Sequence, residues 1–199
     1  MSWTPEPDSA LLIVDVQNDF LPGGALGVPE GHAVIPPLNA LAEQFAAAGR
    51  PVIASRDWHP AVTTHFQPQG GPWPPHCVQG TPGAAFAEAL RLPPGALIVS
   101  KGMGPDEDAY SAFQARDEQG RPLAELLRER GVRHLYVGGL ATDYCVQASA
   151  LDALAHGFRV TVLEDAVRAV DLQPGDGARA LEKLRAAGAT IRPAVGVGG

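Results

Sequence analysis

The most reactive side chain in the sequence, the thiol of Cys145, lies where an apolar segment passes into a predicted helix. Residues 134–139 (HLYVGG) predict a buried strand and residues 143–156 predict a helix, which places Cys145 in the first helical turn. Unpaired N–H groups and the positive end of the helix dipole at that turn favour a thiolate. The same N–H groups could bind a developing oxyanion. A cysteine in a helix is more often a small buried hydrophobic residue, so its position alone does not make it a nucleophile.

Two charged residues end other predicted strands. Asp15 follows the apolar residues 10–14, and Lys101 follows residues 96–99. A cysteine nucleophile needs a base for its proton, which Asp15 can provide, and the charge of Lys101 would lower the pKa of the thiol. The alternatives are a turn or capping role for the aspartate and a solvent-exposed lysine. Because reactive residues end several strands of what we predict to be one sheet, we favour a catalytic site.

A second group of residues has the types and spacing of a metal site. Asp57 and His59 lie two residues apart in an extended segment, so their side chains point to the same side and can share an ion. His76 supplies a third ligand and leaves positions open for water or substrate, as in catalytic metal sites. His65 is a further ligand, a residue behind the ligands or a solvent-exposed side chain. Mixed carboxylate and imidazole ligation suits zinc, manganese or iron.

The overall composition excludes several classes of protein. Charged residues make up 19% and hydrophobic residues 45% of 199 residues, which is typical of a globular protein with one substantial core, and we predict a single domain over residues 1–199. The net charge of −7 argues against nucleic acid or anionic membranes as partners. No apolar run is long enough to span a bilayer, and no signal pattern begins the chain. Two cysteines, Cys77 and Cys145, suit a reducing compartment, so we expect a cytoplasmic protein in which Cys77 is buried and structural.

Predicted strands and helices alternate along the chain. This alternation predicts a three-layer α/β/α fold, with a doubly wound, mostly parallel sheet of six strands. Ligands of such sheets bind beyond the carboxyl ends of the strands. Residues 60–94, rich in proline, glycine, histidine and aromatic residues, form a long irregular segment, which is typical of a functional loop. The remaining predicted strands are 51–55, 159–163 and 190–194, and the remaining predicted helices are 32–48, 122–130 and 177–187.

Seven motifs follow one another over about residues 10–170. They are VDVQNDF (14–20), RDWH (56–59), HF (65–66), WPPHCVQGTPGA (73–84), SKG (100–102), YSAF (110–113) and GLATDYC (139–145). Together they resemble the nicotinamidase/pyrazinamidase family of isochorismatase-like cysteine hydrolases, whose fold is Rossmann-like. The WPPHC and ATDYC segments are the most specific, and the histidine-containing segment separates nicotinamidases from metal-free relatives such as carbamoylsarcosine amidases. Tyr144 stands where some relatives have histidine.

The resemblance implies a role for each candidate residue. Asp15, Lys101 and Cys145 correspond to the catalytic triad. The Leu140–Ala141 peptide is expected to be cis, so that the N–H groups of Ala141 and Cys145 form an oxyanion hole. The metal ligands correspond to Asp57, His59 and His76, with His65 as a fourth ligand in some relatives, and the substrate-binding residues correspond to Phe20, Trp73, Tyr110 and Leu140.

The expected function is hydrolysis of nicotinamide to nicotinate and ammonia in NAD salvage, with pyrazinamide as a further substrate. Catalysis would pass through a thioester of Cys145, and one divalent metal ion, preferably zinc, would orient the pyridine ring. A related cysteine amidase acting on another carboxamide or a ureido compound is the nearest alternative. A non-catalytic metal-binding or thiol redox sensor is the alternative from another class. The partner is a small molecule, and a homo-oligomer is left open.

Overall fold

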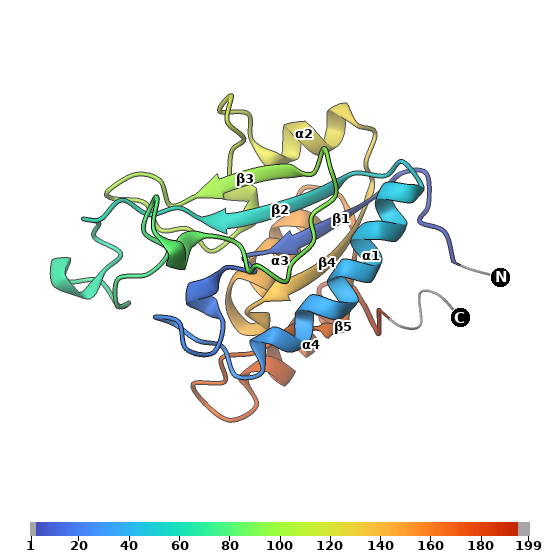
Figure 1. Cartoon of the computed structure of the whole chain (residues 1–199). Coiled ribbons are helices and arrows are strands. Elements are labelled where there is room, and N and C mark those ends of the chain that lie inside the picture. Colours follow the sequence, from blue (N-terminus) through green and yellow to red (C-terminus); the bar gives the residue numbers. More distant parts are fainter. Residues whose placement is uncertain (1–2, 195–199) are drawn as a thin grey trace.

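A six-stranded parallel sheet forms the centre of the fold in the computed structural model, which describes residues 3–194 (Figure 1). The strands are β1 (Ser9–Val14), β2 (Val52–Asp57), β3 (Leu97–Lys101), β4 (His134–Leu140), β5 (Arg159–Arg168) and β6 (Thr190–Arg192). Their order is β3-β2-β1-β4-β5-β6, and every neighbouring pair is parallel. The predicted doubly wound sheet is therefore confirmed, and the direction of winding reverses between β1 and β4.

Two layers of helices cover the sheet because its central strands are apolar on both sides. Every residue of β1 and β4 is buried, as expected of strands inside a parallel sheet. Leu11 and Ile13 pack toward one layer, and Leu12 and Val14 pack toward the other. The first layer contains α1 (Ile35–Ala47), and the second contains α2 (Leu123–Glu129), α3 (Gln147–Ala155) and α4 (Asp176–Ala186).

Several element boundaries differ from those predicted. A 3₁₀ turn, Gly31–Val34, precedes α1, so the α-helix begins later than residue 32. Strand β5 was predicted to end before Glu164 and Asp165, which is wrong. Glu164 points its side chain outward while Ala166 and Val167 are buried, so the chain stays extended past the acidic pair. The strand lengthens across a register shift in its pairing with β4.

Residues 60–94 are irregular, as predicted, and contain only the short 3₁₀ turns Gln67–Gln69 and Pro82–Ala84. Bridges to residues outside the segment hold them in place: His59 pairs with Val78, and Gln17 pairs with Phe86. Within the segment, Phe66 pairs with Trp73. The segment therefore lies against the ends of the strands in a defined conformation (Figure 1). Among residues 3–194, no helix combines the length and the apolar character that crossing a membrane requires.

Candidate active site and metal centre

A cavity of about 320 Å³ lies at the carboxyl edge of the sheet. It contains residues that follow β1 and β4, between which the strand order reverses, and this is where α/β sheets of this kind bind ligands. The four residues predicted to bind substrate all line it, together with Cys145 and parts of the predicted metal site. These lining residues are Phe20, Trp73, Tyr110, Leu140, Asp57, His65 and His76.

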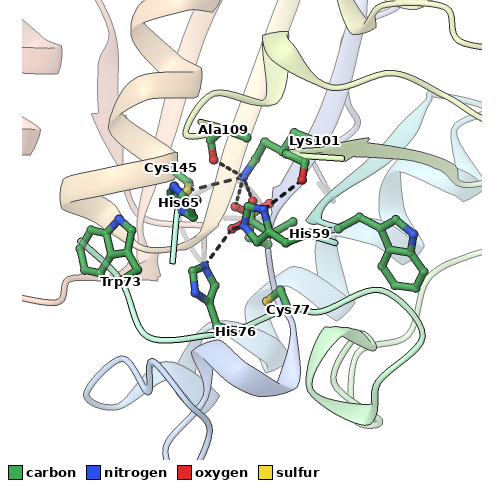
Figure 2. Close-up of polar contacts among 12 residues, drawn as sticks. His59, His65, Trp73, His76, Cys77, Lys101, Ala109 and Cys145 are labelled. Carbon is green, nitrogen blue, oxygen red and sulfur yellow. Dashed lines mark hydrogen bonds and ion pairs between the residues drawn. The ribbon is translucent and has the colours of Figure 1, made fainter. Parts of the chain in front are cut away.

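The three predicted catalytic residues meet beside the cavity, which Cys145 lines. The Lys101 ammonium lies 2.7 Å from Oδ2 of Asp15 and 3.6 Å from Sγ of Cys145, and it also donates to the carbonyl of Ala109 at 3.2 Å (Figure 2). Asp15 and Lys101 are buried, and Cys145 is nearly so. Asp15 has a φ of 50°, a left-handed conformation that is uncommon outside glycine and is often found at functional sites. The three strand ends therefore converge as predicted.

The charge of Lys101 acts to lower the Cys145 pKa, as expected, but it does not set the net shift. Burial raises the pKa of this thiol well above its usual value, and the opposing charge of Lys101 does not offset the burial. Residues Thr142–Val146 also form a π-helical turn before α3, so the cysteine is not in the first turn of a regular α-helix. Burial likewise raises the pKa of Asp15, against the lowering effect of Lys101. The thiol is therefore protonated at rest, beside a carboxyl group with raised proton affinity.

Asp15 has a second hydrogen-bond partner that sequence reasoning missed. The Ser55 hydroxyl donates to Oδ1 of Asp15 at 2.7 Å, while Lys101 occupies Oδ2. Ser55 pairs with Val14 across the β1–β2 ladder, which brings its side chain beside the aspartate. The one indication in the sequence was that a serine ends the otherwise apolar predicted strand 51–55. Both oxygens of the proposed base are thus held in fixed directions.

Asp57 connects the catalytic residues to the metal site. Its Oδ1 contacts the Lys101 ammonium, and its Oδ2 lies 3.4 Å from Nε2 of His59 and 3.7 Å from Nε2 of His76. Burial opposes ionisation of Asp57, but Lys101 and the neighbouring His59 and His76 hold its pKa well below the usual value. The carboxylate is therefore charged and suited to bind a cation.

Three histidine side chains converge beside this carboxylate. His59, His65 and His76 are all buried, and one ligand atom from each lies within 4.8 Å of the others. Figure 2 shows the three residues gathered next to Lys101 and Cys145. Nε2 of His59 is buried without a hydrogen-bond partner among the described residues. Convergent imidazole nitrogens with an adjacent carboxylate fit a divalent metal ion, and His65 belongs to this group.

Each histidine ring is held through its other nitrogen. Such a contact on Nδ1 directs the lone pair of the neutral ring to Nε2 and is the usual arrangement behind metal-binding histidines. The Nδ1 partners are the carbonyl of Gly102 for His59 at 3.0 Å, the carboxylate of Asp108 for His65 at 2.9 Å, and the carbonyl of Pro74 for His76 at 2.8 Å. A side chain on Gly102 would collide with the ring of His59, so glycine is required there.

Gln17 holds the backbone of Asp57, and sequence reasoning did not assign it a role. Its side chain accepts from the N–H of Asp57 at 2.9 Å and donates to the Asp57 carbonyl at 2.8 Å. It also donates to the carbonyl of Ala84 at 2.9 Å. One buried amide thus joins β2 to the segment 60–94. The indication of this role in the sequence was the position of Gln17 within the VDVQNDF motif.

Aromatic side chains form the walls of the cavity. Trp73 donates its indole N–H to the hydroxyl of Tyr110 at 2.9 Å, and its ring meets the edge of Tyr144 with centroids 5.4 Å apart. Phe20 lies against His76, with ring centroids 5.6 Å apart. Flat aromatic walls beside a few polar groups suit a small planar ligand.

The expected cis peptide is present between Leu140 and Ala141. Ala141 and Cys145 both line the cavity, while their joint action as an oxyanion hole stays a prediction.

Asp143, which follows directly in this turn, accepts from the N–H groups of Val170 and Asp171, both at 2.9 Å. Val170 and Leu172 line the cavity. Asp143 therefore attaches the loop after β5 to the turn that carries Cys145. No sequence pattern indicated this wall, because the loop lies far along the chain from the motifs.

Comparisons with known proteins agree with this site. The Isochorismatase domain model matches residues 9–194. The nicotinamidase of Escherichia coli (strain K12) is 42% identical, over 93% of this chain and 94% of its own. The pyrazinamidase of Pyrococcus horikoshii in complex with zinc is 49% identical, with a TM-score of 0.86 over 94% of this chain and 99% of its own. PnC1 of L. infantum in complex with nicotinate is 37% identical, with a TM-score of 0.86 over 98% of both chains. The chain therefore belongs to the isochorismatase family and, within it, to the nicotinamidase/pyrazinamidase family that its motifs resemble.

Proposed function

We propose that the protein is a nicotinamidase, an amidohydrolase that converts nicotinamide to nicotinate and ammonia. The observation that carries this proposal is the meeting of Asp15, Lys101 and Cys145 beside an aromatic-walled cavity, which Cys145 lines together with two residues of the histidine cluster, His65 and His76. The two relatives named for nicotinamidase and pyrazinamidase activity support the same substrate class. The activity would serve NAD salvage, and two free thiols suit a reducing compartment such as the cytoplasm.

In the proposed mechanism, Asp15 accepts the thiol proton of Cys145 as the sulfur attacks the carboxamide carbon. The raised pKa of Cys145 keeps the proton on the free thiol, and the raised pKa of Asp15 suits a carboxylate that accepts it. The tetrahedral intermediate then collapses, its C–N bond breaks, and Asp15 returns the proton to the departing ammonia. Asp15 next takes a proton from water as the water oxygen attacks the thioester. The C–S bond then breaks, Asp15 returns this proton to the sulfur of Cys145, and the acid product leaves as nicotinate after losing its own proton to solvent.

Lys101 and two backbone N–H groups would stabilise the charges that develop during the reaction. The ammonium lies 3.6 Å from the sulfur, so it can balance a thiolate as it forms. The N–H groups of Ala141 and Cys145 would hold the oxyanion. Loss of one such donor typically lowers the rate by about 10²–10³-fold.

Asp57, His59, His65 and His76 would hold one divalent metal ion. We propose zinc, with manganese or iron as alternatives that the same ligands accept. When bound, the ion supplies a Lewis acid that can hold the pyridine nitrogen, directly or through water. Phe20 and Trp73 would contact the faces of the ring, so that the carboxamide is directed at Cys145.

The redox-sensor alternative has less support. Thiols that react readily with peroxide are accessible and have lowered pKa values, whereas burial raises the pKa of Cys145. A cysteine activated only when a substrate binds beside Asp15 fits an amidase better.

Release of ammonia from nicotinamide tests the proposed function. We expect turnover of nicotinamide and pyrazinamide, and a kcat/KM for benzamide that is lower by about 10-fold or more, because benzamide lacks the ring nitrogen and leaves its partner unsatisfied. The measurement is steady-state ammonia production by the purified zinc-loaded protein. Hydrolysis of a ureido compound or an aliphatic amide without turnover of nicotinamide would instead support the related-amidase alternative.

Removal of the metal should affect substrate binding at least as strongly as the chemical step. His59→Ala takes away a buried ligand nitrogen, so we expect loss of bound zinc and a rise in KM at least as large as the fall in kcat. Zinc content by elemental analysis and steady-state kinetics check this result, and chelator treatment of the parent should reproduce it. Normal zinc content in His59→Ala would contradict the assignment of this ligand.

A further inference from the structure

The three histidines of the metal cluster differ in what holds their rings. Backbone carbonyls accept from Nδ1 of His59 and His76, whereas a carboxylate side chain, that of Asp108, pairs with Nδ1 of His65 at 2.9 Å. Both of these acceptors are backbone carbonyls, so neither contact is made by a side-chain group. The orientation of His65 therefore depends on the identity of one residue outside the cluster.

Asp108 reaches His65 from a different part of the chain. It lies in the connection between β3 and α2, 43 residues from its partner. The backbone N–H of Thr64 donates to the carbonyl of Pro105 at 2.8 Å, which fixes this connection against the segment that carries His65. The side chain of His65 is 2% exposed and that of Asp108 is 73% exposed. The Asp108 carboxylate therefore lies between the buried ring of His65 and the solvent.

We propose that Asp108 is a positioning residue for the metal centre, acting through His65. By accepting a hydrogen bond from the Nδ1–H, the carboxylate selects the tautomer whose lone pair is on Nε2 and fixes the plane of the ring. It also makes Nε2 a stronger ligand for a metal ion. No other described side chain hydrogen-bonds this ring. The inference deepens the proposed function and rests on it only for the presence of a divalent ion.

The same connection reaches two other parts of the site. Ala109 gives its carbonyl to the Lys101 ammonium at 3.2 Å, and Tyr110 accepts from the indole of Trp73 at 2.9 Å. A change confined to the Asp108 side chain leaves both of these contacts in place. The expected effect is therefore on metal binding rather than on the fold, since Asp108 is exposed.

The test is the zinc dissociation constant of the metal-free protein, measured by competition with a chromophoric chelator. We expect Asp108→Ala to weaken zinc binding by about 10-fold. This is the lower end of the usual effect of removing a residue that hydrogen-bonds a metal-binding histidine, because water can replace the carboxylate at an exposed site. Asp108→Asn should weaken it less, since the amide oxygen still accepts from Nδ1. Asp106→Ala is the matched control, because it removes the same charge at a position two residues from Asp108. The side chain of Asp106 is also exposed and does not belong to the histidine cluster. It should stay within about twofold of the parent.

The cobalt-loaded proteins give a second readout. The visible absorption of bound Co²⁺ should change in Asp108→Ala and not in Asp106→Ala, because only the first alters the ligand field through His65. Equal zinc affinities of the parent and Asp108→Ala, or equal losses in both alanine variants, would overturn the inference without affecting the proposed function. A parent that binds zinc but does not hydrolyse nicotinamide would overturn the proposed function and leave the comparison of affinities valid.

Discussion

Cys145→Ala is expected to lower kcat for nicotinamide by on the order of 10⁶-fold, the size of loss seen when a covalent nucleophile is removed. Without the sulfur beside Asp15 and Lys101, no thioester can form. The variant should still bind zinc, because the thiol is not among the clustered ligand atoms. Single-turnover ammonia release and zinc content measure the two effects separately.

Cys77→Ala is the matched control for this prediction. Cys77 is the other cysteine of the sequence, and it is fully buried, as predicted. Its backbone N–H donates to Asp19 at 2.8 Å, and its carbonyl accepts from the N–H of His59 at 2.9 Å. Both backbone contacts are retained in alanine. We expect its kcat to stay within about 10-fold of the parent's. Comparable loss in both variants would contradict the assignment of Cys145 as the nucleophile.

Lys101→Met is expected to lower the free energy of unfolding by about 3–5 kcal/mol at neutral pH. The buried ammonium contacts both Asp15 and Asp57, which are themselves buried. Methionine fills a similar volume but leaves two carboxylates without a countercharge, and hydrolysis should be lost as well. Urea unfolding of the metal-free protein measures the change. Lys183→Met is the control, since this other lysine is exposed and should change stability by less than about 0.5 kcal/mol.

The stability loss in Lys101→Met should shrink as the pH falls. Lys101 opposes the burial that raises the pKa of Asp15, so its removal raises that pKa further. When the pKa of a carboxyl group is higher in the folded state than in the unfolded state, the group stabilises the fold at pH values below the unfolded-state pKa. This stabilisation is lost as the pH rises through the folded-state pKa. The deficit relative to the parent is therefore greatest at neutral pH and smaller near pH 4, at about the usual carboxyl pKa. A deficit that grows toward acid pH would contradict this account.

The strands could be predicted because their signal is local. Residues 10–14 and 134–139 are continuous apolar runs, and burial on both faces of the sheet requires such runs. The end of β5 was misplaced because acidic residues were taken to end the strand. A strand can include such residues when their side chains reach solvent, as that of Glu164 does. The π-helical turn around Cys145 depends on the loop packed against it, and no periodicity in the sequence reports that contact.

The site could be predicted in its residues but not in its electrostatics. Motif positions identified the side chains that meet around Lys101, and the cluster of histidines includes the uncertain His65. The raised pKa of Cys145 was not predicted, because burial outweighs the neighbouring positive charge. Ser55 and Asp108 were missed because each is an ordinary residue in sequence, and each acquires its role through a partner about 40 residues away.

The carboxylate of Asp57 serves the ammonium with one oxygen and the histidines with the other. A substitution at Asp57 would therefore alter the histidine cluster and also remove one of the two carboxylates that contact Lys101. A change of ligand at this position cannot be made without changing the charge balance beside the candidate nucleophile.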